Sequence, residues 1–383
     1  MDLALTPEQD AARRSVRDWV DAVVAPDAIR NDREERFPSE ALDGLKRDGW
    51  IGLTIPETYG GGGADPLTYC LVIEELGRGD ANVRSILSVH LGLVAGSIAR
   101  WGNEDQKQQW LPLMATGEAL GCFCLTEPDH GSDPATLEST AVREGDTYRI
   151  NGSKIFITNG DIAGVALVMA RTGGPGARGV SAFLVPCDAP GFTPKPIHGK
   201  LGLRSCDTAE IALNDVVIPA SALLGEEGDG IKVALSALDD GRMSLAASCT
   251  GLAQNALDVM TAYATQREQF GRPIASFQLV QELIADTAVE VEAARLLTWR
   301  VADLKMRGEK YTLAASMAKY YASEASVRAA NAAVQVHGGY GYVDEFVVGK
   351  LLRDARVTTL YEGTSQIQKL LIGRAVTGVS AFG

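Results

Sequence analysis

One carboxylate near the C-terminal end of the sequence stands in surroundings that suit a general base. Glu362 follows the apolar Leu360 and Tyr361 and precedes Gly363, directly before a helix that we predict over 364–376. Glycine lets the backbone come close to a ligand, and a site that excludes water raises the basicity of a carboxylate. These residue types favour removal of a weakly acidic proton from carbon, with the backbone N–H of Glu362 as a donor to the oxygen that becomes negative. The alternative is a carboxylate at a helix N-terminus that the helix dipole favours.

A strand that ends in a polar turn is the second candidate for chemistry. Phe123, Leu125 and Thr126 alternate with their neighbours along a short strand, and the turn at 131–132 then exposes backbone N–H groups and the hydroxyl of Ser132. Such a strand edge could hold a flat heterocycle, with apolar side chains against its face and backbone groups at its polar edge. A plain strand that ends in a turn explains the same residues without a ligand.

The composition describes a chain that is large enough for two or three packed modules. It has 383 residues, 46% of them hydrophobic, and a net charge of −13 from 49 acidic and 36 basic residues. Nucleic-acid binding needs basic surface, so this balance argues against such a partner. We find no secretory signal, no uninterrupted apolar stretch of membrane-spanning length, and no cysteine or histidine spacing typical of a metal site. We therefore expect a cytoplasmic protein with reduced thiols, without a membrane, nucleic-acid or metal partner.

The elements that must position these residues change type twice along the chain. Helical spacing of apolar residues fills 1–119, short runs of β-branched and aromatic residues separated by turns fill 120–226, and long helices return over 227–383. This order differs from the strand–helix alternation of a doubly wound sheet. The first helix begins at Thr6, with Gln9 placed to complete a capping box. We expect a multi-domain α+β protein with a small antiparallel β domain in the middle.

Five sequence blocks, in order, resemble the signatures of the acyl-CoA dehydrogenase family of flavoproteins. The blocks are 125–133, 154–160, 267–273, 335–339 and 361–366. The resemblance extends over essentially the whole chain, from about residue 5 to residue 373. It implies a middle domain like a β-barrel and a C-terminal domain like a four-helix bundle. It also implies bound FAD, an acyl-CoA substrate, an electron-transfer flavoprotein as electron acceptor, and a homotetramer that serves in fatty acid or amino acid catabolism.

The resemblance implies which residues hold the cofactor. They would line the flavin ring or the adenosine diphosphate portion of FAD, and they are Phe123, Leu125, Thr126, Ser132, Phe156, Thr158, Arg267, Phe270, Gln278, Gln335, Gly339, Thr364 and Gln366. Many family members have tryptophan where this chain has Phe156, so the aromatic cover of the flavin is kept. Arg267 would act across a subunit boundary, because a guanidinium offers two donors to a pyrophosphate. A solvated charge at a helix end is the alternative for Arg267.

For the reaction, the resemblance implies that Glu362 removes the α-proton of a short acyl-CoA thioester while hydride leaves the β-carbon for flavin N5. Ser132 would also meet the CoA arm, and further contacts to the substrate would come from Asp239, Arg242, Tyr361 and Gly363. One alternative on the same fold is an oxygen-using acyl-CoA oxidase or flavin hydroxylase. Another is a non-catalytic helical binding protein, which would need no carboxylate beside a flavin motif.

Arg84 and Ser88 bear on the identity of the acyl group. They lie one helical turn apart, on the face that also carries Leu91. A buried cation without a partner is costly, so a charge on this apolar face suggests a ligand. The pattern resembles the glutaryl-CoA dehydrogenase branch of the family, in which the arginine and the second serine meet the distal carboxylate of the substrate. We therefore hypothesise an acyl group that ends in a carboxylate. The alternatives are an Arg84 side chain that extends to solvent and an ordinary monocarboxylic short-chain substrate.

Overall fold

The first part of the chain is helical. The computed structural model describes residues 4–381. Its N-terminal helices are α1 (Pro7–Trp19), α2 (Ala28–Glu34), α3 (Ser39–Arg47), α4 (Pro66–Gly79), α5 (Ala81–Leu87), α6 (Gly96–Trp101) and α7 (Glu104–Thr116). The predicted capping box is confirmed, because the side chains of Thr6 and Gln9 each accept a hydrogen bond from the other residue's backbone N–H, at 3.2 and 3.0 Å.

A π-helical segment lies inside one of these helices. Ser88–Ala95 is π-helical and joins α5 to α6. The whole stretch, Ala81–Trp101, is long and apolar enough to cross a membrane, but 89% of its most apolar window is buried inside the protein, as in a core helix. Single π-helical turns are rare and occur frequently at functional sites. Arg84 and Ser88 therefore lie on a core helix whose geometry is locally unusual.

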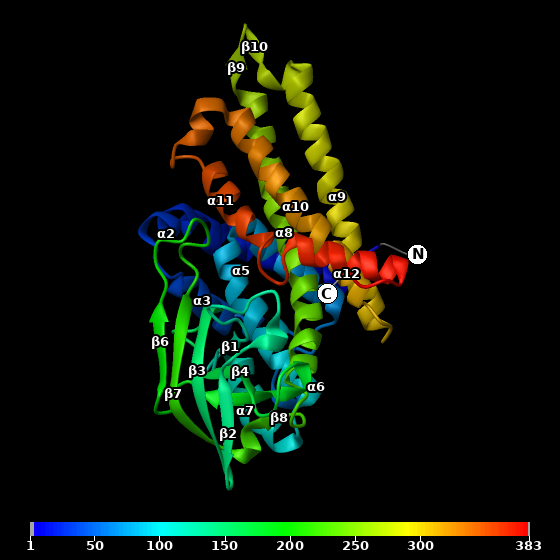
Figure 1. The fold of residues 1–383 in the computed structure, drawn as a ribbon. Helices are drawn as coiled ribbons and strands as arrows, with labels where there is room; N and C mark the ends of the chain where they lie inside the picture. The colour runs from blue at the N-terminus through cyan, green and yellow to red at the C-terminus, as the bar shows by residue number, and fades with distance from the viewer. Residues whose placement is uncertain (1–3, 382–383) are drawn as a thin grey trace.

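The middle of the chain forms a sheet (Figure 1). Its strands are β1 (Gly121–Cys124), β2 (Thr140–Glu144), β3 (Thr147–Thr158), β4 (Val165–Arg171), β5 (Val180–Pro186), β6 (Phe192–Pro196), β7 (Thr208–Pro219) and β8 (Leu223–Leu224). The strand order is β6-β7-β3-β2-β4-β5-β8, with β1 beside β4. Buried side chains such as Tyr148, Phe183 and Ile211 form the core under this sheet.

The sheet is open and mixed, which corrects the expected antiparallel, barrel-like domain. β1 pairs with β4 in parallel, and β2 also meets β4 in parallel at one residue pair. The remaining neighbours are antiparallel. Alternation of apolar residues predicts a strand but not the direction of its neighbour. Parallel neighbours need a crossover connection between them, and here the β2–β3 hairpin lies between β1 and β4 along the chain.

Long helices form the C-terminal part. They are α8 (Gly230–Gln266), α9 (Gln278–Met306), α10 (Thr312–His337), α11 (Val348–Thr358) and α12 (Ser365–Thr377), with a small hairpin of β9 (Glu268–Gln269) and β10 (Arg272–Pro273) after α8. Figure 1 shows α8, α9 and α10 side by side, with α12 crossing them near their middle. Alanines such as Ala329, Ala330 and Ala333 are fully buried in this bundle and permit close helix packing. The helix predicted over 364–376 is confirmed as α12.

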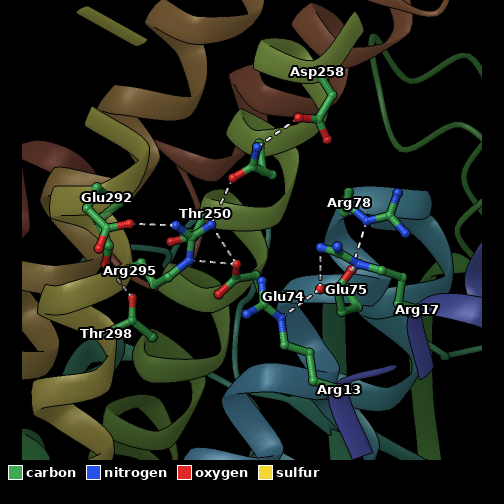
Figure 2. Close-up of polar contacts among 12 residues, drawn as sticks. Arg13, Arg17, Glu74, Glu75, Arg78, Thr250, Asp258, Glu292, Arg295 and Thr298 are labelled. Carbon is green, nitrogen blue, oxygen red and sulfur yellow. Dashed lines mark hydrogen bonds and ion pairs between the residues drawn. The ribbon is translucent and has the colours of Figure 1, made fainter. Parts of the chain in front are cut away.

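Buried ion pairs connect the N-terminal helices to this bundle (Figure 2). Glu74 on α4 pairs with Arg295 on α9 at 2.9 Å. The next residue, Glu75, is 1% exposed and binds three guanidinium groups, those of Arg13, Arg17 and Arg78. Burial alone would raise the pKa of Glu75, but the hydrogen bonds from these arginines hold it below its ordinary value. The network therefore fixes α1 and α4 against each other, and α4 against α9.

The cysteines are free thiols. All except Cys187 are buried, and the Sγ atoms of Cys122 and Cys124 lie 3.8 Å apart on one face of β1. Within residues 4–381, no group of three or more His, Cys, Asp or Glu side chains could hold a metal ion.

Candidate active site

A cavity of about 310 Å³ lies where the helical and sheet parts of the chain meet. Its walls come from the helix of Arg84, from strands β1 and β3 with the turns after β1, from α8, and from the segment that leads into α12. The structure brings these predicted site residues together around it: Arg84, Ser88, Phe123, Leu125, Thr126, Ser132, Phe156, Thr158, Arg242, Tyr361, Glu362 and Gly363. Residues from distant parts of the sequence thus share one site.

Glu362 presents an unpaired carboxylate to this cavity. Its Oε2 atom is buried and has no hydrogen-bond partner within residues 4–381. Burial raises the pKa of Glu362 from 4.5 to about 7, although the positive charges of Arg242 and Lys319 oppose that rise. A carboxylate with this pKa can accept a proton from a weak acid near neutral pH. The backbone N–H of Glu362 also makes no hydrogen bond in the described part of the chain, so it remains available to a ligand.

Space for the carboxylate comes from Gly241 on α8. A Cβ atom at this position would lie 2.6 Å from Oε2 and 2.7 Å from Oε1 of Glu362, so a larger residue would displace the acid. Sequence reasoning missed this residue. The sequence did offer one indication: a glycine inside a long predicted helix lowers helix stability by about 1 kcal/mol relative to alanine, which suggests a packing reason for it. The backbone of Glu362 itself adopts φ +57°, a left-handed conformation that non-glycine residues rarely take.

Arg84 is the second unpaired charge in the cavity. It is 3% exposed, so its side chain does not extend to solvent. One Nη2 hydrogen bond goes to the hydroxyl of Tyr361 at 2.8 Å, while Nε is buried without a partner. Among residues 4–381, no carboxylate lies within ion-pair distance of this guanidinium. Burial raises the pKa of Tyr361 to about 12, so its hydroxyl stays neutral and leaves the charge of Arg84 unbalanced.

Ser88 faces the same cavity and is part of a chain of hydroxyl groups. Its Oγ lies 2.7 Å from Oγ of Ser244, which accepts a hydrogen bond from the hydroxyl of Tyr69 at 3.0 Å. Leu91, predicted on the same face as Ser88, is buried in the core, and Val89 and Leu93 line the cavity instead. The π-helical geometry that starts at Ser88 explains the difference, because it shifts the faces of the helix.

The opposite wall of the cavity suits a flat aromatic group. Phe156 is 66% exposed and has φ +59°, next to an irregularity in the pairing of β3 with β7. The hydroxyls of Thr126, Ser132 and Thr158 line the cavity and make no hydrogen bond in the described part of the chain. An exposed aromatic side chain beside unsatisfied hydroxyl groups fits a heterocycle with an apolar face and polar edges.

A buried ion pair, which the sequence analysis did not predict, supports the turn after β1. Lys154 is fully buried, and its Nζ lies 2.8 Å from Oε1 of Glu127 and 3.2 Å from the carbonyl oxygen of Leu125. Glu127 also accepts hydrogen bonds from the backbone N–H groups of Glu138 and Ser139. The indication in the sequence was a lysine inside a strand in which apolar and polar residues alternate.

Other predicted site residues do not reach this cavity. Asp239 binds Arg242 at 2.9 Å and Thr312 at 2.6 Å, and Thr364 accepts a hydrogen bond from the backbone of Ile367 as the cap of α12. Gln366 is exposed. The residues predicted for the adenosine diphosphate portion, Arg267, Phe270, Gln278, Gln335 and Gly339, lie at the far end of the bundle.

Two residues of this group, Arg267 and Gly339, line a second cavity. That cavity measures about 640 Å³, and Arg267, His337, Gly339 and Tyr340 are among the residues that line it. The end of α8 at Gln266 lies roughly 36 Å along the helix from Arg242, at 1.5 Å per residue. One chain therefore does not place both predicted groups around one dinucleotide. Phe270 is 93% exposed with φ +52°, and its ring meets the ring of Phe277 edge-on, with the centroids 6.0 Å apart.

Together, the structure shows a three-part helical–sheet–helical protein whose first cavity is lined by an unpaired carboxylate and by aromatic side chains. Three family models match the chain in this order. The N-terminal domain of acyl-CoA dehydrogenase matches residues 6–118, its middle domain residues 122–216, and its C-terminal domain residues 228–377. The chain belongs to the acyl-CoA dehydrogenase family, and it is an oxidoreductase that acts on a CH–CH bond of an acyl-CoA.

Individual relatives agree with this assignment. The chain is 44% identical over 375 residues to an acyl-CoA dehydrogenase of Bacillus subtilis, which covers 98% of this chain and 99% of the relative. Butyryl-CoA dehydrogenase of Megasphaera elsdenii superimposes with a TM-score of 0.96 at 39% identity, over 98% of this chain and 100% of the other.

Two further structures are similar and carry information on ligands and partners. Glutaryl-CoA dehydrogenase of Mycobacterium smegmatis in complex with FADH2 has a TM-score of 0.94 at 36% identity, over 99% of this chain and 97% of the other. A chain in a structure of the electron transferring flavoprotein of Acidaminococcus fermentans has a TM-score of 0.96 at 39% identity, over 98% and 100% of the two chains.

Proposed function

We propose that this enzyme is an FAD-dependent dehydrogenase in which Glu362 removes the α-proton of a short acyl-CoA thioester. The observation that carries the proposal is the buried, unpaired Oε2 of Glu362 together with the raised pKa of this acid. The free backbone N–H of Glu362 would donate to the thioester oxygen as negative charge develops there. When bound, FAD accepts the hydride from the β-carbon.

The flavin ring would lie against Phe123, Leu125 and Phe156, with the hydroxyls of Thr126, Ser132 and Thr158 at its polar edges. A neighbouring copy of the chain would bring Arg267, Phe270, Gln278, Gln335 and Gly339 to the adenosine diphosphate portion, since one chain holds these two groups far apart. Thr364 and Gln366 would complete the cofactor contacts, and Asp239, Arg242, Tyr361 and Gly363 those to the substrate. Apolar side chains that are exposed on the C-terminal bundle, such as Leu279 at 76% and Val289 at 68%, support association into a homotetramer.

The acyl group would end in a carboxylate that Arg84 and Ser88 hold. The supporting observation is a guanidinium that is 3% exposed, lines the cavity, and has no acidic partner in the described chain. A ligand carboxylate would provide the missing charge and accept a hydrogen bond from Nε. A monocarboxylic short-chain substrate is the second candidate, because the chain is similar to a butyryl-CoA dehydrogenase over 98% of its length.

Anaerobic mixing with glutaryl-CoA or butyryl-CoA tests both candidates through bleaching of the flavin absorbance. We expect Arg84→Met to lower kcat/KM for glutaryl-CoA by about 100-fold, because truncating one member of a buried charge pair costs about 2–5 kcal/mol. The value for butyryl-CoA should change by less than about threefold, since that substrate offers no charge to Arg84. Equal losses for both substrates would contradict the carboxylate proposal and leave the monocarboxylic one.

The electron acceptor would be an electron-transfer flavoprotein. Support comes from the similar chain in the structure of the Acidaminococcus fermentans protein of that name. We further propose a cytoplasmic enzyme, with domain limits at 1–119, 120–226 and 227–383. Limited proteolysis followed by mass determination would locate those limits.

A further inference from the structure

Lys319 on α10 is a buried cation directly behind the turn that carries the catalytic acid. It is 0% exposed, and its Nζ donates a hydrogen bond to the carbonyl oxygen of Gly363 at 2.7 Å. Within residues 4–381, no carboxylate lies within ion-pair distance of this ammonium. A buried charge without an acidic partner is costly. A purely apolar packing role would favour a neutral side chain of similar length at this position.

The turn itself needs support. Glu362 and Gly363 have φ +57° and +83°, and a non-glycine residue in this left-handed region costs roughly 1–2 kcal/mol. Both carbonyl groups of the turn are held by side chains. Glu362 O accepts hydrogen bonds from Gln368 at 2.9 Å and Arg242 at 3.4 Å, and Gly363 O accepts from Lys319 at 2.7 Å and Gln368 at 3.3 Å. Among these contacts, the bond from Lys319 is the shortest.

Charge also links the lysine to the acid. Burial lowers the pKa of Lys319 to about 8, while the negative charge of Glu362 opposes that fall. In return, the positive charge of Lys319 lowers the pKa of Glu362, against the effect of burial. The other groups that act on this pair come from α5, α8 and α10: Arg84, Arg242, Cys249 and Glu324.

We propose that Lys319 is a positioning residue, which holds the Glu362–Gly363 turn in its left-handed conformation and thereby aims the carboxylate of Glu362 into the cavity. The proposal rests on the role of Glu362 given above. Lys319 does not line the cavity and so acts on the substrate only through Glu362. Its charge keeps a larger fraction of Glu362 in the ionised, proton-accepting form near neutral pH.

Lys319→Met tests the proposal, because it keeps the length of the side chain and removes both the donor and the charge. We expect kcat to fall by about 10- to 100-fold, as for a catalytic group displaced by about 1 Å, with KM changed by less than about threefold. Without the positive charge the pKa of Glu362 rises, so the acid limb of the kcat–pH profile should move up by about one unit. Lys319→Arg should restore the position of that limb, because it keeps both charge and donor.

Lys350→Met is the matched control. Lys350 is a buried lysine of the same bundle that pairs with Asp80 and Asp354, outside the cavity. Loss of Lys350 should lower the thermal unfolding midpoint and leave the acid limb of the kcat–pH profile unchanged. If Lys319→Met gives the same pattern as this control, Lys319 is only structural and the proposal is wrong. If Lys319→Met does not fold, the kcat–pH profile of Lys319→Gln is measured instead. An upward shift of its acid limb supports the proposal, and an unmoved acid limb overturns it. Glu362→Gln, measured alongside, separates this outcome from failure of the proposed function, since full activity there would remove Glu362 as the base.

Discussion

Glu75 and Glu362 are the same residue type, the first buried and the second half-buried at the cavity with its Oε2 covered, and the protein treats them in opposite ways. Glu75 accepts hydrogen bonds from Arg13, Arg17 and Arg78 (Figure 2), and its pKa lies below the ordinary value despite burial. Glu362 keeps Oε2 without a partner, and burial raises its pKa to about 7. The two acids differ in their partners, since three guanidinium groups surround Glu75 and none binds Oε2 of Glu362.

Removing the charge of Glu75 should have a large effect on stability and little effect on catalysis. Glu75→Gln leaves three guanidinium groups around a neutral side chain. Breaking a fully buried pair costs about 3–5 kcal/mol, and because these arginines are partly exposed we expect about 2–3 kcal/mol of lost unfolding free energy. Thermal or denaturant unfolding measures the loss. Glu292→Gln is the control, since Glu292 is 60% exposed in its pair with Arg295 and its loss should cost about 0.5 kcal/mol or less. Similar costs for the two variants would contradict the structural role of Glu75.

Filling the space beside Glu362 should damage catalysis and spare the fold. Gly241→Ala places a methyl group 2.6 Å from the present position of Oε2, so the carboxylate must move. We expect kcat to fall by about 10- to 100-fold with FAD content unchanged, because small displacements of a catalytic group have effects of this size. Gly373→Ala on α12 is the control, since a Cβ there meets no atom within 4 Å. Wild-type kcat in Gly241→Ala would show that the acid is not confined as the structure indicates.

The two carboxylates should also affect stability with opposite dependence on pH. The raised pKa of Glu362 means that the folded protein binds a proton more tightly there than the unfolded chain, so this residue lowers stability as pH rises from about 4.5 to about 7. Glu362→Gln should therefore be more stable than wild type by about 1–2 kcal/mol at about pH 8 and nearly equal at about pH 5. The lowered pKa of Glu75 has the reverse sign: its contribution is present above the ordinary carboxyl pKa and is lost as pH falls. Thermal midpoints of Glu362→Gln between about pH 5 and pH 8, and of Glu75→Gln from about pH 6 down to about pH 3, measure the two dependences against wild type, and changes of the same sign would contradict the prediction.

Local signals in the sequence predicted the elements well. The capping box at Thr6 and the helix of 364–376 are both found in the structure, because capping and helical periodicity depend on neighbours in the chain. The five sequence blocks and the separate pattern at 84–88 predicted many of the residues that meet around the first cavity, including Arg84 and Glu362 from distant parts of the chain. That success came from family resemblance, since no local pattern indicates contact over such a separation.

Features that depend on distant partners could not be predicted. The parallel pairing of β1 with β4 depends on where the chain returns to the sheet, which apolar alternation does not encode. The π-helical turn at Ser88 and the room that Gly241 makes for Glu362 depend on packing between segments. No sequence pattern distinguishes Lys319, and only the fold shows that it is buried behind the Glu362–Gly363 turn.

The central claim is that Glu362 removes the proton that starts the reaction. It is tested most directly by the rate at which an acyl-CoA reduces the flavin of Glu362→Gln in the absence of oxygen, with bound FAD quantified in the same sample. Loss of a general base lowers rates by about 100- to 10,000-fold, and we expect a fall of about 1,000-fold with FAD fully retained. Flavin reduction at the wild-type rate in this variant would contradict the claim.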